Sequence, residues 1–415
     1  MLEKVKIKER NIKDYRNVIS DTLFNEIFLL SKELKGLRVI MVNSTSKGGG
    51  VAEILSSLVP LMEDVGINVS WHTISAEEEF FNLTKEMHNA LQGKNYPLTP
   101  QLKEVYKKNM ERLSGMIQDM EADVWVIHDP QPMGIIDFLP KNSSSISHIH
   151  IDTSHPDKDA WEFISSFLSK YDKIIFSAKE FVPLNFPEEK AEIIHPAIDP
   201  LTEKNSLSDP VQARKLLQGF GIDPEKPLIS QVSRFDPWKN PSGVIEAYKI
   251  AKKKIPGLQL ALVGLLLASD DPEAVKVYRE VEKEAKGDPD IFLFFNPDRL
   301  GNLSVDRFVN AFQTRSEVII QNSIREGFGL TVSEAMWKQK AVIGGNVGGI
   351  KIQIKDGENG FLVSNTEEAA ERIINLLKNE GLRTRLGKNA QKTVQENFLI
   401  PRLLRDYMLL FKSVV

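Results

Sequence analysis

The sequence predicts an α/β protein made of two doubly wound domains, each with a parallel sheet between helices. Short apolar runs alternate with amphipathic stretches along most of the chain, which is typical of β-α-β units. A polar, proline-bearing stretch at 200–226 interrupts this alternation, which restarts after it. The length of 415 residues also exceeds that of a usual single domain.

The first domain opens with a β-α-β unit. An apolar run from Leu37 to Val42 is followed by the glycine loop SKGGGV (46–51), an amphipathic segment and a second apolar run. A parallel pair of strands needs such a crossover connection. Further strands are predicted at 122–129, 146–154, 173–178 and 191–199.

Residues 76–120 depart from this rhythm. The segment is long and mainly helical in pattern, with the turn-like NYPLTP inside it. We expect either an insertion that shapes the ligand site or a surface for oligomerisation, with a homodimer as one outcome, and the sequence favours neither.

The second domain is predicted from the strands and helices that follow the interruption. We expect strands at 227–235, 258–264, 290–296, 316–321, 340–345 and 359–363, helices at 243–255 and 305–313, and two helical stretches after the last strand. We place a hinge near 200–210 and assign 1–205 to the first domain and 206–395 to the second. The helix at about 396–415 is expected to pack back onto the first domain.

Composition excludes several classes of protein. The chain has no cysteine, which excludes disulfides, cysteine nucleophiles and thiolate metal sites. A net charge of -4 argues against a general nucleic-acid binder. No apolar run is long enough for a membrane span, and the first residues are too charged for a secretory signal, so we expect a cytoplasmic protein. The missing cysteines and the many Lys and Glu residues would fit a thermophilic source.

The stretch SIREGFGLTVSEA (323–335) carries two carboxylates around a glycine turn. A predicted strand ends before it, and residues 328–338 have the pattern of a helix. The first turn of that helix would offer unpaired amides to an anion. Glu326 precedes this turn, and Glu334 lies about two turns into the helix, where a buried carboxylate needs a hydroxyl or cationic partner. A sugar nucleotide supplies hydroxyls and a diphosphate, but a helix-terminal acid and a solvated glutamate explain the spacing equally well.

Two further stretches offer anion-binding groups. VSRFDPWKNP (232–241) follows the strand that opens the second domain, and it places Arg234 and Lys239 five residues apart across a turn. Two such cations can neutralise a diphosphate, although isolated surface charges are the alternative. The glycine loop at 46–51 lacks the GxGxxG spacing of nicotinamide sites and the GK[ST] of nucleoside triphosphatases. Its glycines let backbone approach a ligand closely, unless they only form a tight turn.

Taken in order, these motifs resemble a known family. GGGV, R-x-D-P-x-K-N and E-G-F-G-L-T-x-x-E-A are similar to the motifs of the retaining GT-B glycosyltransferases, in the large family that contains sucrose and trehalose synthases. HIHIDTSHPD (148–157) resembles the H-I-D-x-S segment of trehalose phosphorylases and of nucleotide-sugar-dependent trehalose synthases. Alone, its histidines are better explained by packing or solvation at a strand end.

The resemblance implies two facing domains with catalysis in a central cleft, the donor on the second domain and the acceptor on the first. It assigns the diphosphate to Arg234 and Lys239, the donor hexose to Glu326 and the ribose to Glu334. It assigns the acceptor to His150 and Asp152. The backbone groups that it implies for ligand binding are those of Gly48, Gly49, Gly50, Gly327, Phe328, Gly329 and Leu330.

The implied reaction joins glucose from UDP- or ADP-glucose to a second glucose, giving α,α-trehalose reversibly and with retention at the donor carbon. No metal site and no cofactor are implied, and Mg²⁺ would at most stimulate. The implied partners are the nucleotide sugar and glucose or trehalose, with no nucleic acid and no membrane. A trehalose phosphorylase and a non-catalytic sugar-nucleotide sensor of the same fold remain open alternatives.

Overall fold

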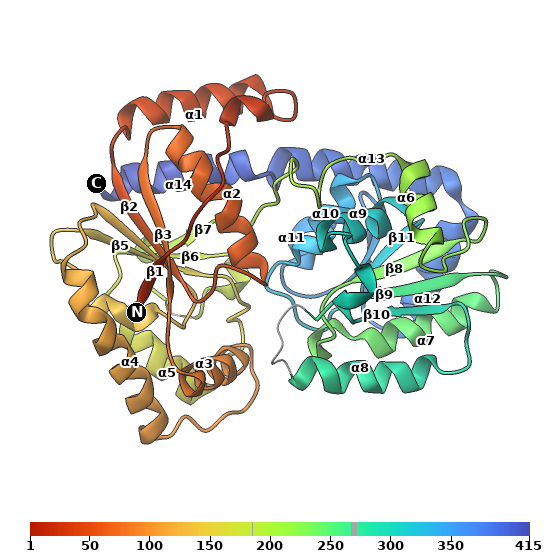
Figure 1. Ribbon diagram of the computed structural model, residues 1–415, viewed down its shortest axis with the longest axis horizontal. Coiled ribbons are helices and arrows are strands. Elements are labelled where there is room, and N and C mark those ends of the chain that lie inside the picture. Colours follow the sequence, from red (N-terminus) through yellow and green to blue (C-terminus); the bar gives the residue numbers. More distant parts are fainter. Residues whose placement is uncertain (185, 267–271) are drawn as a thin grey trace. The chain divides into compact units, whose positions relative to one another are not determined.

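A computed structural model describes residues 1–184, 186–266 and 272–415, and the chain divides into two compact units (Figure 1). The first contains Met1–Ala197 and Ile400–Val415, and the second contains Ile198–Leu399. The sequence places this division at 205 and 395. The segment after residue 197 belongs to the second unit because Asn310 donates hydrogen bonds to the carbonyls of Glu203 and Ser206.

The first unit is built on a seven-stranded sheet with the order β1-β3-β2-β4-β5-β6-β7. Its strands are β1 (Leu2–Lys4), β2 (Arg38–Asn43), β3 (Asn68–Ile74), β4 (Val124–His128), β5 (Ser144–Ile149), β6 (Lys173–Phe176) and β7 (Ala191–Ile193). All pairs are parallel except β1 with β3, which is antiparallel. The strands predicted at 37–42, 122–129 and 173–178 are confirmed, whereas β1 was not predicted. The strand predicted at 146–154 ends at Ile149, so His150 and Asp152 lie in the loop after it.

Helices of the first unit are α1 (Asp21–Glu33), α2 (Gly50–Asp64), α3 (Glu78–Leu91), α4 (Pro100–Gln118), α5 (Lys158–Leu168) and α14 (Ile400–Val414). Short 3-10 helices lie at Ile12–Tyr15, Met133–Phe138, Lys179–Phe181 and Glu188–Lys190. The helical character predicted for 76–120 is confirmed by α3 and α4. A tyrosine of α4 fixes this segment to the loop after β4, since Tyr106 donates to the carbonyl of Pro130 and accepts from the amide of Gly134.

The second unit has a six-stranded parallel sheet with the order β10-β9-β8-β11-β12-β13. Its strands are β8 (Leu228–Val232), β9 (Gln259–Val263), β10 (Ile291–Phe294), β11 (Val318–Gln321), β12 (Ala341–Gly345) and β13 (Phe361–Val363). All six strands predicted for this domain are confirmed, with shorter ends.

Helices of the second unit are α6 (Pro210–Gln218), α7 (Pro241–Lys252), α8 (Pro272–Ala285), α9 (Val305–Arg315), α10 (Leu330–Trp337), α11 (Ile350–Gln353), α12 (Thr366–Lys378) and α13 (Glu380–Asn397), with 3-10 helices at Pro237–Lys239 and Pro297–Leu300. One core joins the sheet to α7, α8 and α12, and another joins it to α6 and α9, so the sheet is covered on both faces. Two helical stretches were predicted after the last strand, but there are three, because the stretch before the predicted helix at 396–415 is divided between α12, which ends at Lys378, and α13, which begins at Glu380.

In both units the chain order reverses at one place in the sheet. In the first unit the strands on the two sides of this place are β2 and β4, and in the second they are β8 and β11. Loops at the carboxyl ends of such neighbouring strands leave in opposite directions, and ligands of doubly wound folds bind there. The fold thus marks the loops after β2, β4, β8 and β11.

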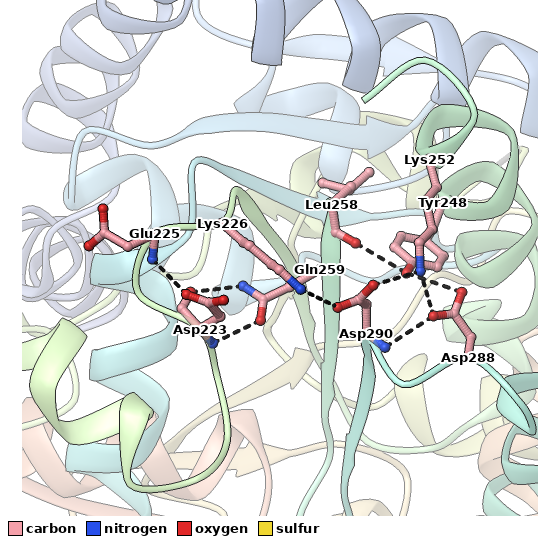
Figure 2. Close-up of polar contacts among 9 residues, drawn as sticks. All are labelled: Asp223, Glu225, Lys226, Tyr248, Lys252, Leu258, Gln259, Asp288 and Asp290. Atoms are coloured by element: carbon pink, nitrogen blue, oxygen red, sulfur yellow. Dashed lines mark hydrogen bonds and ion pairs between the residues drawn. The ribbon is translucent and has the colours of Figure 1, made fainter. Parts of the chain in front are cut away.

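A network of polar side chains lies at the opposite edge of the second sheet, before the strands begin (Figure 2). Lys252 Nζ lies 2.6 Å from Asp288 Oδ1 and 2.9 Å from Asp290 Oδ2, and Lys226 Nζ lies 3.1 Å from Asp290 Oδ1. Tyr248 donates to the carbonyl of Leu258. We assign this network a structural role, because the loops that bind ligands in doubly wound folds lie at the other end of the strands.

We expect Asp290→Asn to lower the free energy of unfolding by about 2 kcal/mol at neutral pH, the scale of charged hydrogen bonds. The hydrogen bond from Lys252 lowers the pKa of Asp290 against the opposing effect of burial. A depressed pKa stabilises the fold above the unfolded pKa of about 3.9, and this contribution is lost as the pH falls through the folded pKa. In urea titrations from pH 7 to pH 3, the difference in unfolding free energy between the two proteins should therefore become smaller toward the acid end. A difference that is constant with pH would contradict this.

Within the described residues, no helix combines the length and the apolar character that a bilayer span requires.

Candidate functional site

The loop after β8 holds Lys239 in a fixed position. Asp236 accepts a hydrogen bond from the amide of Trp238 (2.9 Å) and so caps the short helical turn Pro237–Lys239. At the end of β8, Gln231 donates to the carbonyl of Lys239 (2.7 Å). Asn240 then turns the chain with a φ of 50° and caps α7. Because its backbone is held on both sides, Lys239 can direct its ammonium group toward the neighbouring loop.

Lys239 and Glu326 form an ion pair at the place where the chain order reverses. The distance from Lys239 Nζ to Glu326 Oε2 is 2.5 Å, and the side chains are 18% and 10% exposed. Ser323 donates to the same oxygen at 3.3 Å. The two loops are also joined through the backbone, since the amide of Ile324 donates to the carbonyl of Trp238 (2.9 Å). The structure thus brings together two residues that the sequence predicts for one ligand.

The helix α10 begins beside this pair. Gly329 precedes it with a φ of 84°, a conformation that side-chain-bearing residues rarely adopt, and Leu330 is the first helical residue. A Cβ on Gly329 would also lie 3.1 Å from Glu326 Cγ. The amides of this first helical turn can bind an anion, and α10 follows a parallel strand at its carboxyl end.

Two residues that the sequence analysis missed hold the turn before α10. Gln353 donates to the carbonyls of Phe328 (2.6 Å) and Gly349 (3.2 Å), and it accepts from Ser333. A Cβ at Gly349 would lie 2.2 Å from Phe328 Cα, so only glycine lets these loops come so close. The glycine-rich GGNVGG at 344–349, directly after a strand, was a signal for this contact.

Arg234 contacts an acidic residue of its own loop. Its guanidinium group lies 3.0 Å from Asp236 Oδ2, and its side chain is 64% exposed. The sequence assigns both cations to one diphosphate. Lys239 contacts Glu326, whereas the contact described for Arg234 is the one with Asp236.

Glu334 is fully buried in a second polar cluster of the same unit. Its Oε1 lies 2.7 Å from Lys204 Nζ, and its Oε2 accepts from Gln313 Nε2 at 2.8 Å. Burial alone would raise the pKa of Glu334, but the charges of Lys204 and Lys338 outweigh it and keep the pKa below its ordinary value. Glu334 therefore has the cationic partner that a buried carboxylate needs, and both of its oxygens are engaged by protein groups.

In the first unit the glycine loop lies after β2. Gly48 and Gly49 have φ values of 69° and 119°, and α2 begins at Gly50. A Cβ at Gly48 or Gly49 would meet nothing within 4 Å, so backbone conformation rather than crowding requires glycine there. Asn43, at the end of β2, holds the loop by donating to the carbonyl of Thr45 (2.6 Å). The loop is thus preformed at the place where the chain order of this sheet reverses.

His150, in the loop after β5, lies beside two buried imidazoles, those of His128 at the end of β4 and His148 in β5. A hydrogen bond of 2.9 Å joins its Nε2 to Nδ1 of His128, and its ring stacks on His148 with centroids 3.7 Å apart. Desolvation by burial lowers the pKa of all three rings, so they are neutral at pH 7. The sequence analysis named His150 but not His128, whose position at a strand end before Asp129 was the available signal.

Asp129 is another residue of this site that was not predicted from the sequence. It has a φ of 65°, which is rare for a residue with a side chain, and its Oδ1 accepts from the amide of His150 (2.8 Å). Burial raises the pKa of Asp129 to about 7, although the hydrogen bond from His150 opposes this. A carboxyl group with such a pKa can exchange a proton or a hydroxyl hydrogen bond near neutral pH.

Asp152 is engaged locally. Its Oδ1 accepts from both the amide (2.9 Å) and the hydroxyl (2.6 Å) of Ser154. This turn fixes the loop after β5, so the side chain of Asp152 already has a structural role beside any contact with an acceptor.

Comparisons with known proteins agree with this arrangement of two units. Residues 41–183 match the family described as "Trehalose synthase, N-terminal domain", and residues 213–393 match "Glycosyl transferases group 1". The chain is 45% identical to a trehalose synthase of Pyrococcus horikoshii, over 98% of this chain and 97% of the relative. It is 41% identical to a trehalose synthase of Rubrobacter xylanophilus over the full length of both.

Among solved structures, the chain is similar in fold to an α,α-trehalose-phosphate synthase (UDP-forming) from Burkholderia xenovorans in complex with glucose-6-phosphate. The TM-score is 0.71 at 13% identity, covering 91% of this chain and 100% of that chain. At this identity the likeness concerns the fold, which is the GT-B glycosyltransferase fold predicted from the sequence.

Proposed function

Because the chain belongs to the trehalose synthases within the group 1 glycosyltransferases and is a hexosyltransferase, we propose that it makes α,α-trehalose from a nucleoside diphosphate glucose and glucose. The observation that carries the proposal is the Lys239–Glu326 pair beside the first turn of α10. It offers a cation and backbone amides to a diphosphate and a carboxylate to sugar hydroxyls. A nucleotide sugar as the donor is also supported by the structural neighbour that is described as UDP-forming.

In this proposal the second unit binds the donor. Lys239 and the amides of Gly327, Phe328, Gly329 and Leu330 compensate the diphosphate charge, with Arg234 as a further cation. Glu326 accepts hydrogen bonds from the donor glucose. Protein groups can stabilise such a leaving group in the transition state without a bound metal ion. Mg²⁺ would then stimulate the reaction but not be required for it.

The first unit binds the acceptor glucose in this proposal. Asp129, after β4, and His150, after β5, contact the acceptor hydroxyls. The loop Gly48–Gly50 supplies backbone amides to the bound substrates. The bond between the donor C1 and the diphosphate oxygen breaks, and the acceptor oxygen bonds to C1 on the same face. The proton of that acceptor hydroxyl passes to the leaving diphosphate. The products are trehalose and nucleoside diphosphate, and the same steps run in reverse.

The test incubates the purified protein with glucose and, separately, UDP-glucose, ADP-glucose or α-glucose 1-phosphate. We expect a nucleotide sugar to give a non-reducing disaccharide whose proton spectrum shows a single α-anomeric signal, because the two glucose units of α,α-trehalose are equivalent. If glucose 1-phosphate is the only donor that gives trehalose, the proposal is contradicted and the protein is a phosphorylase. Tight binding of a nucleotide sugar without any product would indicate a sensor.

We expect Glu326→Gln to lower turnover strongly while the affinity for the free nucleoside diphosphate is nearly unchanged. The carboxylate faces the hexose in this proposal, so its loss misorients the donor sugar and leaves the diphosphate contacts in place. Calorimetry with UDP and ADP, together with initial rates, measures both quantities. Equal losses of affinity and turnover would assign Glu326 to the nucleotide instead.

We expect His150→Ala to reduce trehalose formation and raise the Michaelis constant for glucose, with nucleotide affinity unchanged. His150 lies in the first unit, beside Asp129. His155 is an exposed histidine of the same loop, and His155→Ala serves as the control. A loss of UDP binding in His150→Ala would place this residue in the donor subsite.

A further inference from the structure

Strand register brings three histidines together in the interior of the first unit. His128 at the end of β4 is paired with His148 of β5, and His150 follows two residues later. Residues two apart in an extended segment lie on the same side of a sheet, so all three rings gather on one side. One ring nitrogen of each lies within 4.8 Å of those of the other two.

Two of these rings carry an unsatisfied nitrogen. Nε2 of His128 and Nε2 of His148 are both buried and have no hydrogen-bond partner within the part of the chain that the structure describes. Buried polar atoms are rarely left in this state, and each such atom calls for a ligand, an ion or a water molecule. A neutral imidazole carries a lone pair on one of its two ring nitrogens, and that nitrogen can bind a metal ion.

Tyr407 of α14 holds one of the rings from the other side. Its hydroxyl lies 2.5 Å from Nδ1 of His148, on the ring whose Nε2 has no partner. This is the arrangement of a metal-binding histidine, in which one ring nitrogen faces the ion and the other is fixed by an outer hydrogen bond.

We propose that His128, His148 and His150 bind one divalent transition-metal ion. Three neutral imidazoles suit Zn²⁺, Co²⁺ or Ni²⁺, whereas Mg²⁺ and Ca²⁺ prefer oxygen ligands. A tetrahedral ion with bonds of about 2.1 Å needs nitrogens about 3.4 Å apart, so the His148 and His150 rings must rotate out of their stacked positions to close the cluster around an ion. His128 and His148 then bind the ion through the buried Nε2 atoms that lack a partner, His150 binds it through one ring nitrogen, and a water molecule completes the coordination. This site departs from the metal-free protein that the sequence predicts.

The test measures binding and does not use activity, so it is independent of the function proposed above. The full-length protein is treated with a chelator, dialysed, and titrated with Co²⁺ while its visible absorption is recorded, and with Zn²⁺ in a calorimeter. We expect one ion per chain and the intense visible bands of four-coordinate Co²⁺. His128→Gln should weaken Zn²⁺ binding about 100-fold or more. Tyr407→Phe keeps every ligand and should weaken it about tenfold, the effect of losing an outer partner.

His155→Gln is the matched control, because His155 is exposed in the same unit. We expect it to bind like the parent. Thermal melts without metal show whether each variant folds, and Tyr407→Phe keeps the test decisive if His128→Gln does not. The proposal is overturned if the parent shows no four-coordinate Co²⁺ bands, if folded His128→Gln binds Zn²⁺ like the parent, or if His155→Gln loses as much affinity as His128→Gln.

Discussion

Replacing Lys239 with methionine is expected to lower turnover by about 100-fold or more. The lysine is the cation that the structure holds at the start of α10, and removing one preorganised group from a developing negative charge has an effect of this size. The effect concerns the transition state, because charge on the leaving diphosphate grows as its bond to the sugar breaks. Initial rates at saturating nucleotide sugar and glucose measure it.

A matched variant separates this effect from a general change of charge. Lys254 is exposed just after α7 in the same unit, and Lys254→Met should keep parental turnover. Lys239→Met also leaves Glu326 without its ion pair. The double variant with Glu326→Gln shows whether the unpaired carboxylate contributes to the loss of turnover. Turnover of Lys239→Met within twofold of the parent would remove Lys239 from the donor site.

Replacing Glu334 with alanine is expected to lower the free energy of unfolding by about 3–5 kcal/mol, the usual effect of removing one member of a buried ion pair. The change leaves the ammonium groups of Lys204 and Lys338 without the carboxylate between them. In a unit of this size, such a loss lowers the melting temperature by about 10 °C. Calorimetric melts measure it, and Glu246→Ala, on the exposed side of α7, is the control.

The isosteric variant Glu334→Gln tests the proposed contact with ribose. Affinities are measured well below the melting temperature of the variant. If the carboxylate also accepts ribose hydroxyls, UDP and UDP-glucose should both bind more weakly, by about 1.5–3 kcal/mol. Unchanged affinities in a destabilised protein would show that Glu334 acts by fixing the segment of Lys204, and not by contacting nucleotide.

Alternation of apolar runs predicted the two sheets because a buried parallel strand must be apolar along its whole length. The same rule explains one omission, and overlooked helix start signals explain another. The strand β1 is only three residues long, with two of them exposed, so it has no apolar run to detect. The helix α6 lies in a stretch dismissed as polar, although Asp209 as its cap and Pro210 as its first residue were available start signals.

The parts of the candidate site that lie in short sequence motifs could be predicted. Lys239 and Glu326 were both named, and their direct pairing needed only the knowledge that two loops leave neighbouring strands. The partners of Glu334 were not predictable, since Lys204 and Gln313 are distant in the chain and reach it through packing. The same holds for Tyr407, which is brought to His148 only by the return of the chain to its first unit.

That return has a consequence for how the protein is made. Residues 400–415 belong to the first unit, where Ser144 donates to the carbonyl of Val414 and Arg402 donates to the carbonyls of His195 and Pro196. On the ribosome these residues appear only after all of the second unit has been synthesised. Domains usually fold in the order of synthesis. Here the unit that is translated first is completed last. The apolar surface that α14 covers in this unit therefore stays exposed during translation, and accessible to chaperones, while the second unit is synthesised.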